Sequence, residues 1–95
     1  MANIELVKGR TSTGFDFSVK KNLLENIEFL ELYAKVQDGD SMKMFQLLDM
    51  VLGEAQKKDL YDHVRNDDGD VLIDPLTKEL TDIFDRLGEV DATKN

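Results

Sequence analysis

The sequence contains no cysteine, no tryptophan and a single proline in 95 residues. Without cysteine there is no disulfide framework, thiolate zinc site or cysteine nucleophile, which is typical of a reducing cytoplasm. The chain begins with no apolar stretch of signal-peptide length, and no segment reaches the roughly 20 apolar residues of a membrane-spanning helix. Basic residues are few, with 12 Lys and Arg against 20 Asp and Glu, so the net charge is −8. An acidic surface repels nucleic acid and anionic membranes, and we expect neither as a partner.

The length and composition predict one globular domain spanning residues 1–95. Hydrophobic residues make up 41% of the chain and charged residues 34%, which is globular rather than disordered. We expect a mainly α fold, a small bundle of about four helices after a short N-terminal β-hairpin or extended segment. A domain of this size buries only roughly 60–65% of its unfolded surface. Its modest core leaves room for stabilisation by a partner or by a second copy in a homo-oligomer.

Residues 41–65 are the stretch around which the fold is expected to form. Its first half, Met42–Leu52, is apolar around most of the helix circumference, which predicts burial on several sides. Gly53 tolerates the left-handed backbone that ends a helix, so a tight corner is expected there. The second half, Glu54–Arg65, has a narrower apolar stripe and is expected to lie on the surface.

The flanking segments are expected to pack against this central pair. Residues 1–18 alternate apolar and polar residues around a Gly- and Thr-containing turn, which predicts the hairpin. A first helix is expected from about Lys20 to Val36. Asp74 and Pro75 predict the start of a last helix that ends at Gly88, followed by a flexible tail over 89–95.

Two readings of catalytic or metal chemistry are disfavoured by the spacing. The acidic stretch 66–70 resembles an EF-hand loop, but Val64 and Pro75 occupy positions that need ligand carboxylates, so an acidic turn explains it better. His63 and Ser41 could form part of a hydrolytic triad, but the sequence has no nucleophile elbow. We therefore expect a protein that is not an enzyme and needs no cofactor or metal.

A carrier-protein function remains open as an alternative. Gly39–Met42 resembles the site at which acyl or peptidyl carrier proteins receive phosphopantetheine on a serine, here Ser41. A helix N-terminus there would help to hold the phosphodiester. The competing interpretation is that Asp40 or Ser41 only caps the following helix.

Protein binding is the better-supported function on residue grounds. The first helix has a wider apolar face than one packing partner needs, and Phe29, Leu32 and Tyr33 are predicted to form an exposed contact patch. Met42 and Met44 are the second candidates, because methionines form adaptable binding surfaces. The competing interpretation places the methionines in the core.

Several segments resemble the tail assembly chaperones of long-tailed, siphovirus-type bacteriophages that infect Gram-positive hosts. The similarity covers roughly residues 15–95 and is carried by Phe15–Phe17, Asn26–Ala34, Leu52–Arg65 (LGEAQKKDLYDHVR), Asp67–Gly69 and Leu80–Phe84. The resemblance implies a non-enzymatic protein of the host cytoplasm that is absent from the mature virion. It would bind the tape measure protein, keep it soluble and recruit tail tube protein through a C-terminally extended form.

Overall fold

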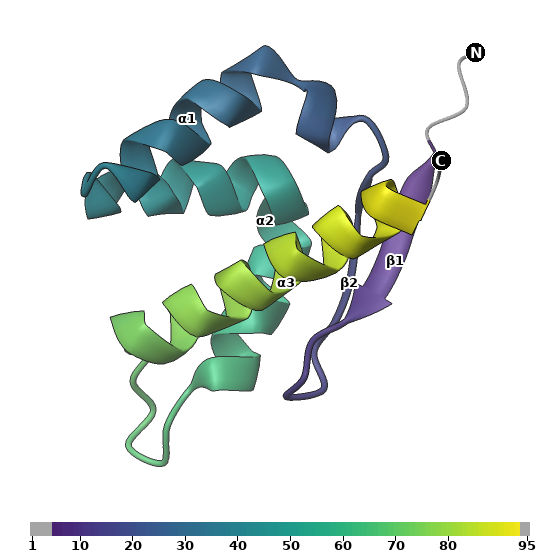
Figure 1. The fold of residues 1–95 in the computed structure, drawn as a ribbon. Coiled ribbons are helices and arrows are strands. Elements are labelled where there is room, and N and C mark those ends of the chain that lie inside the picture. The colour runs from purple at the N-terminus through teal and green to yellow at the C-terminus, as the bar shows by residue number, and fades with distance from the viewer. Residues whose placement is uncertain (1–4, 94–95) are drawn as a thin grey trace.

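A β-hairpin and three α-helices make up the chain in the computed structural model, which describes the backbone of residues 5–93 and the side chains of residues 5–88 (Figure 1). The elements in order are β1 (Leu6–Arg10), β2 (Asp16–Lys20), the 3-10 turn η1 (Leu23–Glu25), α1 (Ile27–Gln37), the 3-10 turn η2 (Ser41–Lys43), α2 (Met44–Val64) and α3 (Ile73–Thr93). The predicted mainly α fold with an N-terminal hairpin is confirmed, with three α-helices instead of about four. None of the helices in the described part of the chain is long and apolar enough to cross a membrane.

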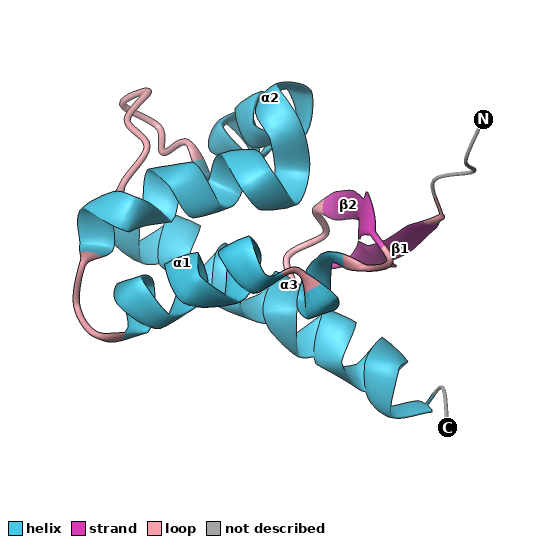
Figure 2. Cartoon of the chain, turned by 90° about the horizontal axis from the view of Figure 1, so that it is seen from above, coloured by secondary structure: helices cyan, strands magenta, loops and turns pink. Residues whose placement is uncertain are grey.

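The hairpin lies to one side of the helices (Figure 2), and its apolar side chains belong to the same buried core as theirs. Its strands are antiparallel, with Val7 opposite Val19 and Gly9 opposite Phe17. Phe17, Val19 and Phe15 are buried, as expected for side chains that alternate along a half-covered strand. Ile4, also expected in a strand, lies outside the described residues.

The first helix begins later than the sequence analysis predicted. The alternating pattern of Phe17 and Val19 continues to the end of β2, so Lys20 belongs to the strand. Asn26 then caps α1, because its Oδ1 accepts hydrogen bonds from the backbone N–H groups of Glu28 at 2.9 Å and Phe29 at 3.3 Å. The start predicted at about Lys20 is therefore wrong, and the N-cap fixes it at Ile27.

The outer edge of β2 is closed by a side chain instead of a third strand. Gln56 Oε1 accepts a hydrogen bond from the backbone N–H of Ser18 at 2.8 Å, and Gln56 Nε2 donates to the Ser18 carbonyl at 2.8 Å. Nε2 also donates to the Leu52 carbonyl of its own helix at 2.9 Å. The amide thus satisfies both backbone groups that a neighbouring strand would otherwise pair.

Helix α2 bends at Gly53, which has φ 76° and ψ 172°. The predicted corner is confirmed: the backbone leaves helical geometry at Gly53, where the two expected helical halves meet within the single bent element α2 (Figure 1). The first half has five buried side chains, Leu47 and Leu48 among them, although Phe45 and Met50 are 41% and 39% exposed; the second half has a single buried side chain, Leu60. The predicted contrast between a core half and a surface half is also confirmed.

Helix α3 differs from its prediction at both ends. It starts at Ile73, one residue before Asp74, and it continues through Gly88 to Thr93. The end predicted at Gly88 is wrong, because a glycine inside a helix costs only about 1 kcal/mol. The core face carries buried apolar residues at helical spacing, namely Leu76, Leu80, Ile83 and Leu87. The predicted flexible tail, residues 89–95, lies outside the described side chains.

Candidate protein-binding surfaces

The face of α1 that was predicted to be an exposed patch belongs to the core. Phe29 is 2% exposed, Leu32 is buried and Tyr33 is half-buried. The Phe29 and Tyr33 rings stack with centroids 5.9 Å apart, and Phe84 from α3 lies edge-on to both, at 5.5 and 5.0 Å. The prediction of an exposed patch here is wrong. Packed aromatic rings stabilise the fold, and Phe84 contacts both rings on this face of α1.

The opposite face of α1 is left uncovered. Ile27 is 64% exposed, Leu30 is 42% exposed and Ala34 is also exposed, and their spacing places them on one side of the helix. We call these three residues the α1 stripe. Exposed acidic residues, Glu28 and Glu31, lie beside it. The sequence analysis expected more apolar surface on the first helix than one packing partner needs, and α1 does leave apolar side chains exposed, but on this face and not at Phe29 and Leu32.

The two candidate methionines have different environments. Met42, in η2, is 70% exposed. Met44, at the start of α2, is 2% exposed, and the Thr77 hydroxyl of α3 donates to its sulfur at 3.6 Å. Of the five residues predicted to contact a partner, Met42 is therefore the most accessible, and Met44 fits the core interpretation.

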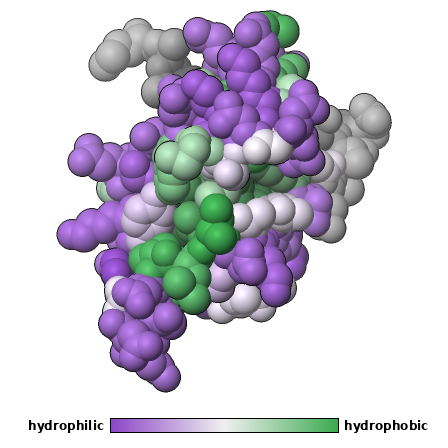
Figure 3. Space-filling model, turned by 90° about the vertical axis from the view of Figure 1, so that its left-hand side faces the viewer, coloured by the Kyte–Doolittle hydropathy of each residue, from purple (hydrophilic) through white to green (hydrophobic). Residues whose placement is uncertain are grey.

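Met42 lies in η2, directly before α2, and α2 and α3 begin on the same side of the molecule (Figure 1). The Thr77–Met44 contact places the starts of these helices next to each other, and Thr77 also donates to the Ile73 carbonyl at 2.8 Å. Leu72 and Ile73 are 51% and 52% exposed there. Figure 3, which views the left-hand side of Figure 1, shows apolar side chains gathered on this face among hydrophilic ones. We call Met42, Leu72 and Ile73 the corner patch.

Aspartates flank the corner patch in both chain segments that form it. Residues 38–43 and 66–74 carry one basic residue, the half-buried Lys43. The same segments carry six exposed aspartates, namely Asp38, Asp40, Asp67, Asp68, Asp70 and Asp74. The patch is thus an apolar area within a strongly negative field.

The acidic turn before α3 is held by its own backbone. Asn66 Oδ1 accepts from the backbone N–H groups of Asp68 at 3.0 Å and Asp70 at 2.9 Å, and Gly69 takes a φ of 88°. This geometry is an Asx turn, in which the Asn oxygen replaces a backbone acceptor. Within residues 5–88, the structure has no group of three or more His, Cys, Asp or Glu side chains arranged to hold a metal ion.

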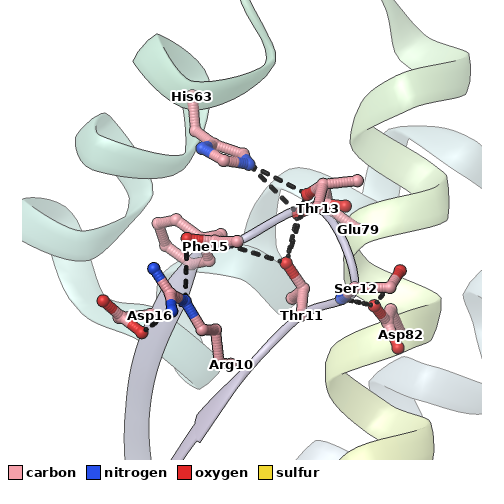
Figure 4. Close-up of polar contacts among 10 residues, drawn as sticks. Arg10, Thr11, Ser12, Thr13, Phe15, Asp16, His63, Glu79 and Asp82 are labelled. Atoms are coloured by element: carbon pink, nitrogen blue, oxygen red, sulfur yellow. Dashed lines mark hydrogen bonds and ion pairs between the residues drawn. The ribbon is translucent and has the colours of Figure 1, made fainter.

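A polar cluster joins the hairpin turn to α2 and α3 (Figure 4). Glu79 is 4% exposed, and its Oε1 accepts hydrogen bonds from the hydroxyls of Thr11 at 2.9 Å and Thr13 at 2.7 Å. The Thr11 hydroxyl in turn accepts from the backbone N–H of Phe15 at 3.0 Å. A carboxylate can be buried here because the hairpin supplies donors to it.

His63 belongs to the same cluster, but its contacts do not have the geometry of a catalytic triad. Its Nε2 lies 2.9 Å from the Thr13 hydroxyl and 3.7 Å from Glu79 Oε1. A catalytic triad needs the acid on one ring nitrogen and the nucleophile on the other. Here both groups meet the same nitrogen, so the imidazole cannot pass a proton between them. The cluster fits a structural clamp, and the non-enzymatic assignment stays a prediction.

A second clamp lies one turn further along α3. Asp82 Oδ2 accepts hydrogen bonds from the backbone N–H of Ser12 at 2.6 Å and from the Ser12 hydroxyl at 2.9 Å. The backbone hydrogen bond from Ser12, with smaller contributions from its hydroxyl and from Arg86, lowers the pKa of Asp82 below its usual value. The ionised carboxylate is therefore the form that holds the hairpin turn against α3.

Two of these features were missed in the sequence analysis. Leu72 and Ile73 were not among the predicted contact residues, although both are exposed at the start of α3. Glu79 had a usable signal, because it lies three residues after Leu76 and four before Ile83, within the apolar stripe of α3. A charged residue in that position predicts a buried, paired carboxylate. Comparison of the chain with protein-family models, curated proteins and solved structures finds no match.

Proposed function

We propose that this protein is a non-enzymatic tail assembly chaperone that binds the tape measure protein of a long-tailed phage. The observation that carries the proposal is the α1 stripe, where Ile27 and Leu30 remain 64% and 42% exposed beside a closed core. Large apolar side chains left on the surface of a small domain are typical of a protein-binding face. The net charge of −8 supports the same function, because it keeps a complex with an aggregation-prone partner soluble.

The chemistry of such a chaperone would be covering and releasing apolar helix surface. A very long helical protein exposes apolar stripes before assembly, and each chaperone copy would cover a short section through the α1 stripe. Many weak contacts along one chain give avidity while each can be displaced singly. Tail tube protein would replace the chaperone stepwise, recruited by a C-terminally extended form. The complex would act in the host cytoplasm, and the chaperone would be absent from the finished virion.

Co-expression with a tape measure fragment tests this function. We expect the wild-type chain to keep the fragment in the soluble fraction and to co-purify with it. The double variant Ile27→Ser plus Leu30→Ser should lose both effects, because serine removes the apolar contact without disturbing the core. The matched control is Leu6→Ser plus Met50→Ser, which changes two other exposed apolar residues, 51% and 39% exposed. Retained binding by the first variant, with both variants folded, would reject the α1 stripe as the contact.

A carrier protein is the alternative function, favoured by the exposure of Ser41. This serine is the first residue of η2 and is solvent-exposed, so its hydroxyl can be reached by a transferase. Its backbone N–H bonds the Gly39 carbonyl at 2.9 Å. Incubation with a phosphopantetheinyl transferase and coenzyme A, followed by intact-mass measurement, distinguishes the two functions. A mass gain that disappears in Ser41→Ala would establish the carrier and refute the chaperone as the primary activity.

A further inference from the structure

We infer that the corner patch formed by Met42, Leu72 and Ile73 is a second docking surface, specific for a short polypeptide segment that carries apolar side chains flanked by lysine or arginine. This surface is distinct from the α1 stripe, so the inference does not depend on the tape measure protein as partner. It is argued from the exposure of the three side chains and from the charge that surrounds them.

The apolar part of the surface is carried by residues at or directly before the starts of two helices, α2 and α3. Ile73 begins α3, and the contact from Thr77 to Met44 fixes that helix start against the start of α2. The three side chains are half exposed or more, at 70%, 51% and 52%. Burial of large apolar side chains at roughly 25 cal/mol per Å² is the main source of binding free energy for a small interface. A short segment with a few apolar side chains matches a surface of this size.

The charge around the patch selects the sign of the partner. Six exposed aspartates lie in the two segments that form it, against one half-buried lysine, Lys43. Three cations border the two segments in sequence, namely Lys35, Arg65 and Lys78. Of these, Arg65 is engaged locally, bonding Asp62 at 2.9 Å and the Gly69 carbonyl at 2.8 Å. Complementary charge steers association and disfavours partners of the same sign. Lysine or arginine on both sides of the apolar residues would meet this rim.

The same charge argues against other occupants. A symmetric dimer through the patch would bring two sets of aspartates into one interface, since a two-fold contact uses the same surface twice. Nucleic acid and anionic lipid carry phosphates that this rim repels. An acidic amphipathic segment would be rejected for the same reason.

Fluorescence anisotropy with three labelled synthetic peptides tests the inference on the full chain. The first peptide is a 14-residue amphipathic helix of leucine and lysine. The second has glutamate in place of every lysine, and the third has serine in place of every leucine. We expect only the leucine–lysine peptide to bind, and its affinity should fall as salt is raised from 50 to 300 mM, because the Debye length shortens to less than about 10 Å.

Two pairs of variants assign the binding to the corner. Met42→Ser plus Ile73→Ser should lower the affinity for the leucine–lysine peptide about tenfold or more, as expected for central apolar contacts. Leu6→Ser plus Met50→Ser, which changes two exposed apolar residues outside both surfaces, is its control and should leave the affinity unchanged. Asp40→Asn plus Asp70→Asn should weaken binding by about threefold and flatten the salt dependence.

The control for the charge pair is Asp59→Asn plus Asp85→Asn, which removes the same charge from exposed positions outside the two rim segments. It should change the affinity less than the rim pair does. Three results would overturn the inference: binding of the glutamate peptide with equal affinity, equally tight binding of the serine–lysine peptide, or unchanged binding of the leucine–lysine peptide by the corner variant. Circular dichroism on each variant confirms that the fold is retained before binding is compared.

Discussion

Replacing Glu79 with alanine removes the acceptor that two hydroxyls of the hairpin turn share. Hydrogen bonds to a charged group contribute about 1.5–3 kcal/mol each. In the variant, the Thr11 hydroxyl can donate to the Thr13 oxygen, which already lies 3.2 Å away. Only part of the hydrogen-bond free energy is therefore lost. Alanine also removes the free-energy cost of burying the Glu79 carboxylate, which is 4% exposed, and this offsets a further part of the lost stability. We expect a net loss of about 2 kcal/mol in the free energy of unfolding.

Urea unfolding followed by far-ultraviolet circular dichroism at pH 7 measures this loss. For a domain of this size the melting temperature should fall by about 8–16 °C. Asp85→Ala is the control, because Asp85 is an exposed acid of the same helix, and it should change the unfolding free energy by less than about 0.5 kcal/mol. Glu79→Gln keeps an oxygen acceptor without the charge and should fall between the two.

Equal stability of Glu79→Ala and Asp85→Ala would refute the reasoning. That result would mean that the buried carboxylate gains no more from the hairpin hydroxyls than it loses by leaving water. The hairpin would then be held by its buried apolar side chains and by the contacts of Ser12 with Asp82 and of Ser18 with Gln56.

The remaining predictions concern the backbone and pH. Gly53→Ala should lose about 1–3 kcal/mol of stability, since φ 76° with ψ 172° is available almost only to glycine. Gly88→Ala, inside α3 with open space around it, should instead gain up to about 1 kcal/mol. Melting temperatures that change in the same direction in both variants would contradict this. Gly9→Ala should lose about 1–3 kcal/mol, because a Cβ there would lie 2.6 Å from the buried Phe17 ring; an unchanged urea midpoint would count against it. The folded pKa of Asp82 is lowered, so its contribution is present above the unfolded pKa of about 3.9 and is lost as the pH falls through the folded value. The stability difference between wild type and Asp82→Asn should therefore shrink between pH 6 and pH 3, and a constant difference would disprove the link.

Much of the fold could be predicted because its signals are local. The alternation around Phe15 and Phe17 predicted the hairpin, and Gly53 predicted the bend in α2. Element ends were less predictable, because they depend on competing interactions. Asn26 caps α1 through a side-chain hydrogen bond, whereas α3 continues through Gly88 because the residues on both sides are helical.

The binding surfaces could be predicted only in part, because burial is decided between elements. The composition of α1 showed that some apolar residues must stay exposed. Which face is covered depends on Phe84, more than 50 positions along the chain from Phe29, and on the shape of the ring cluster the two residues form with Tyr33. The corner patch likewise depends on where α2 and α3 begin relative to each other. No periodicity within one segment contains that information.

The two-stranded sheet depends on the side-chain amide of Gln56 in α2 for part of its stability. An isolated hairpin is marginally stable in water, and here the third position of the sheet is filled from the far side of the Gly53 bend. A peptide of residues 5–21 alone would lack both this amide and the apolar cover, and it should remain unstructured. The same amide occupies the outward backbone groups of Ser18, which disfavours pairing of a further strand at that point of β2.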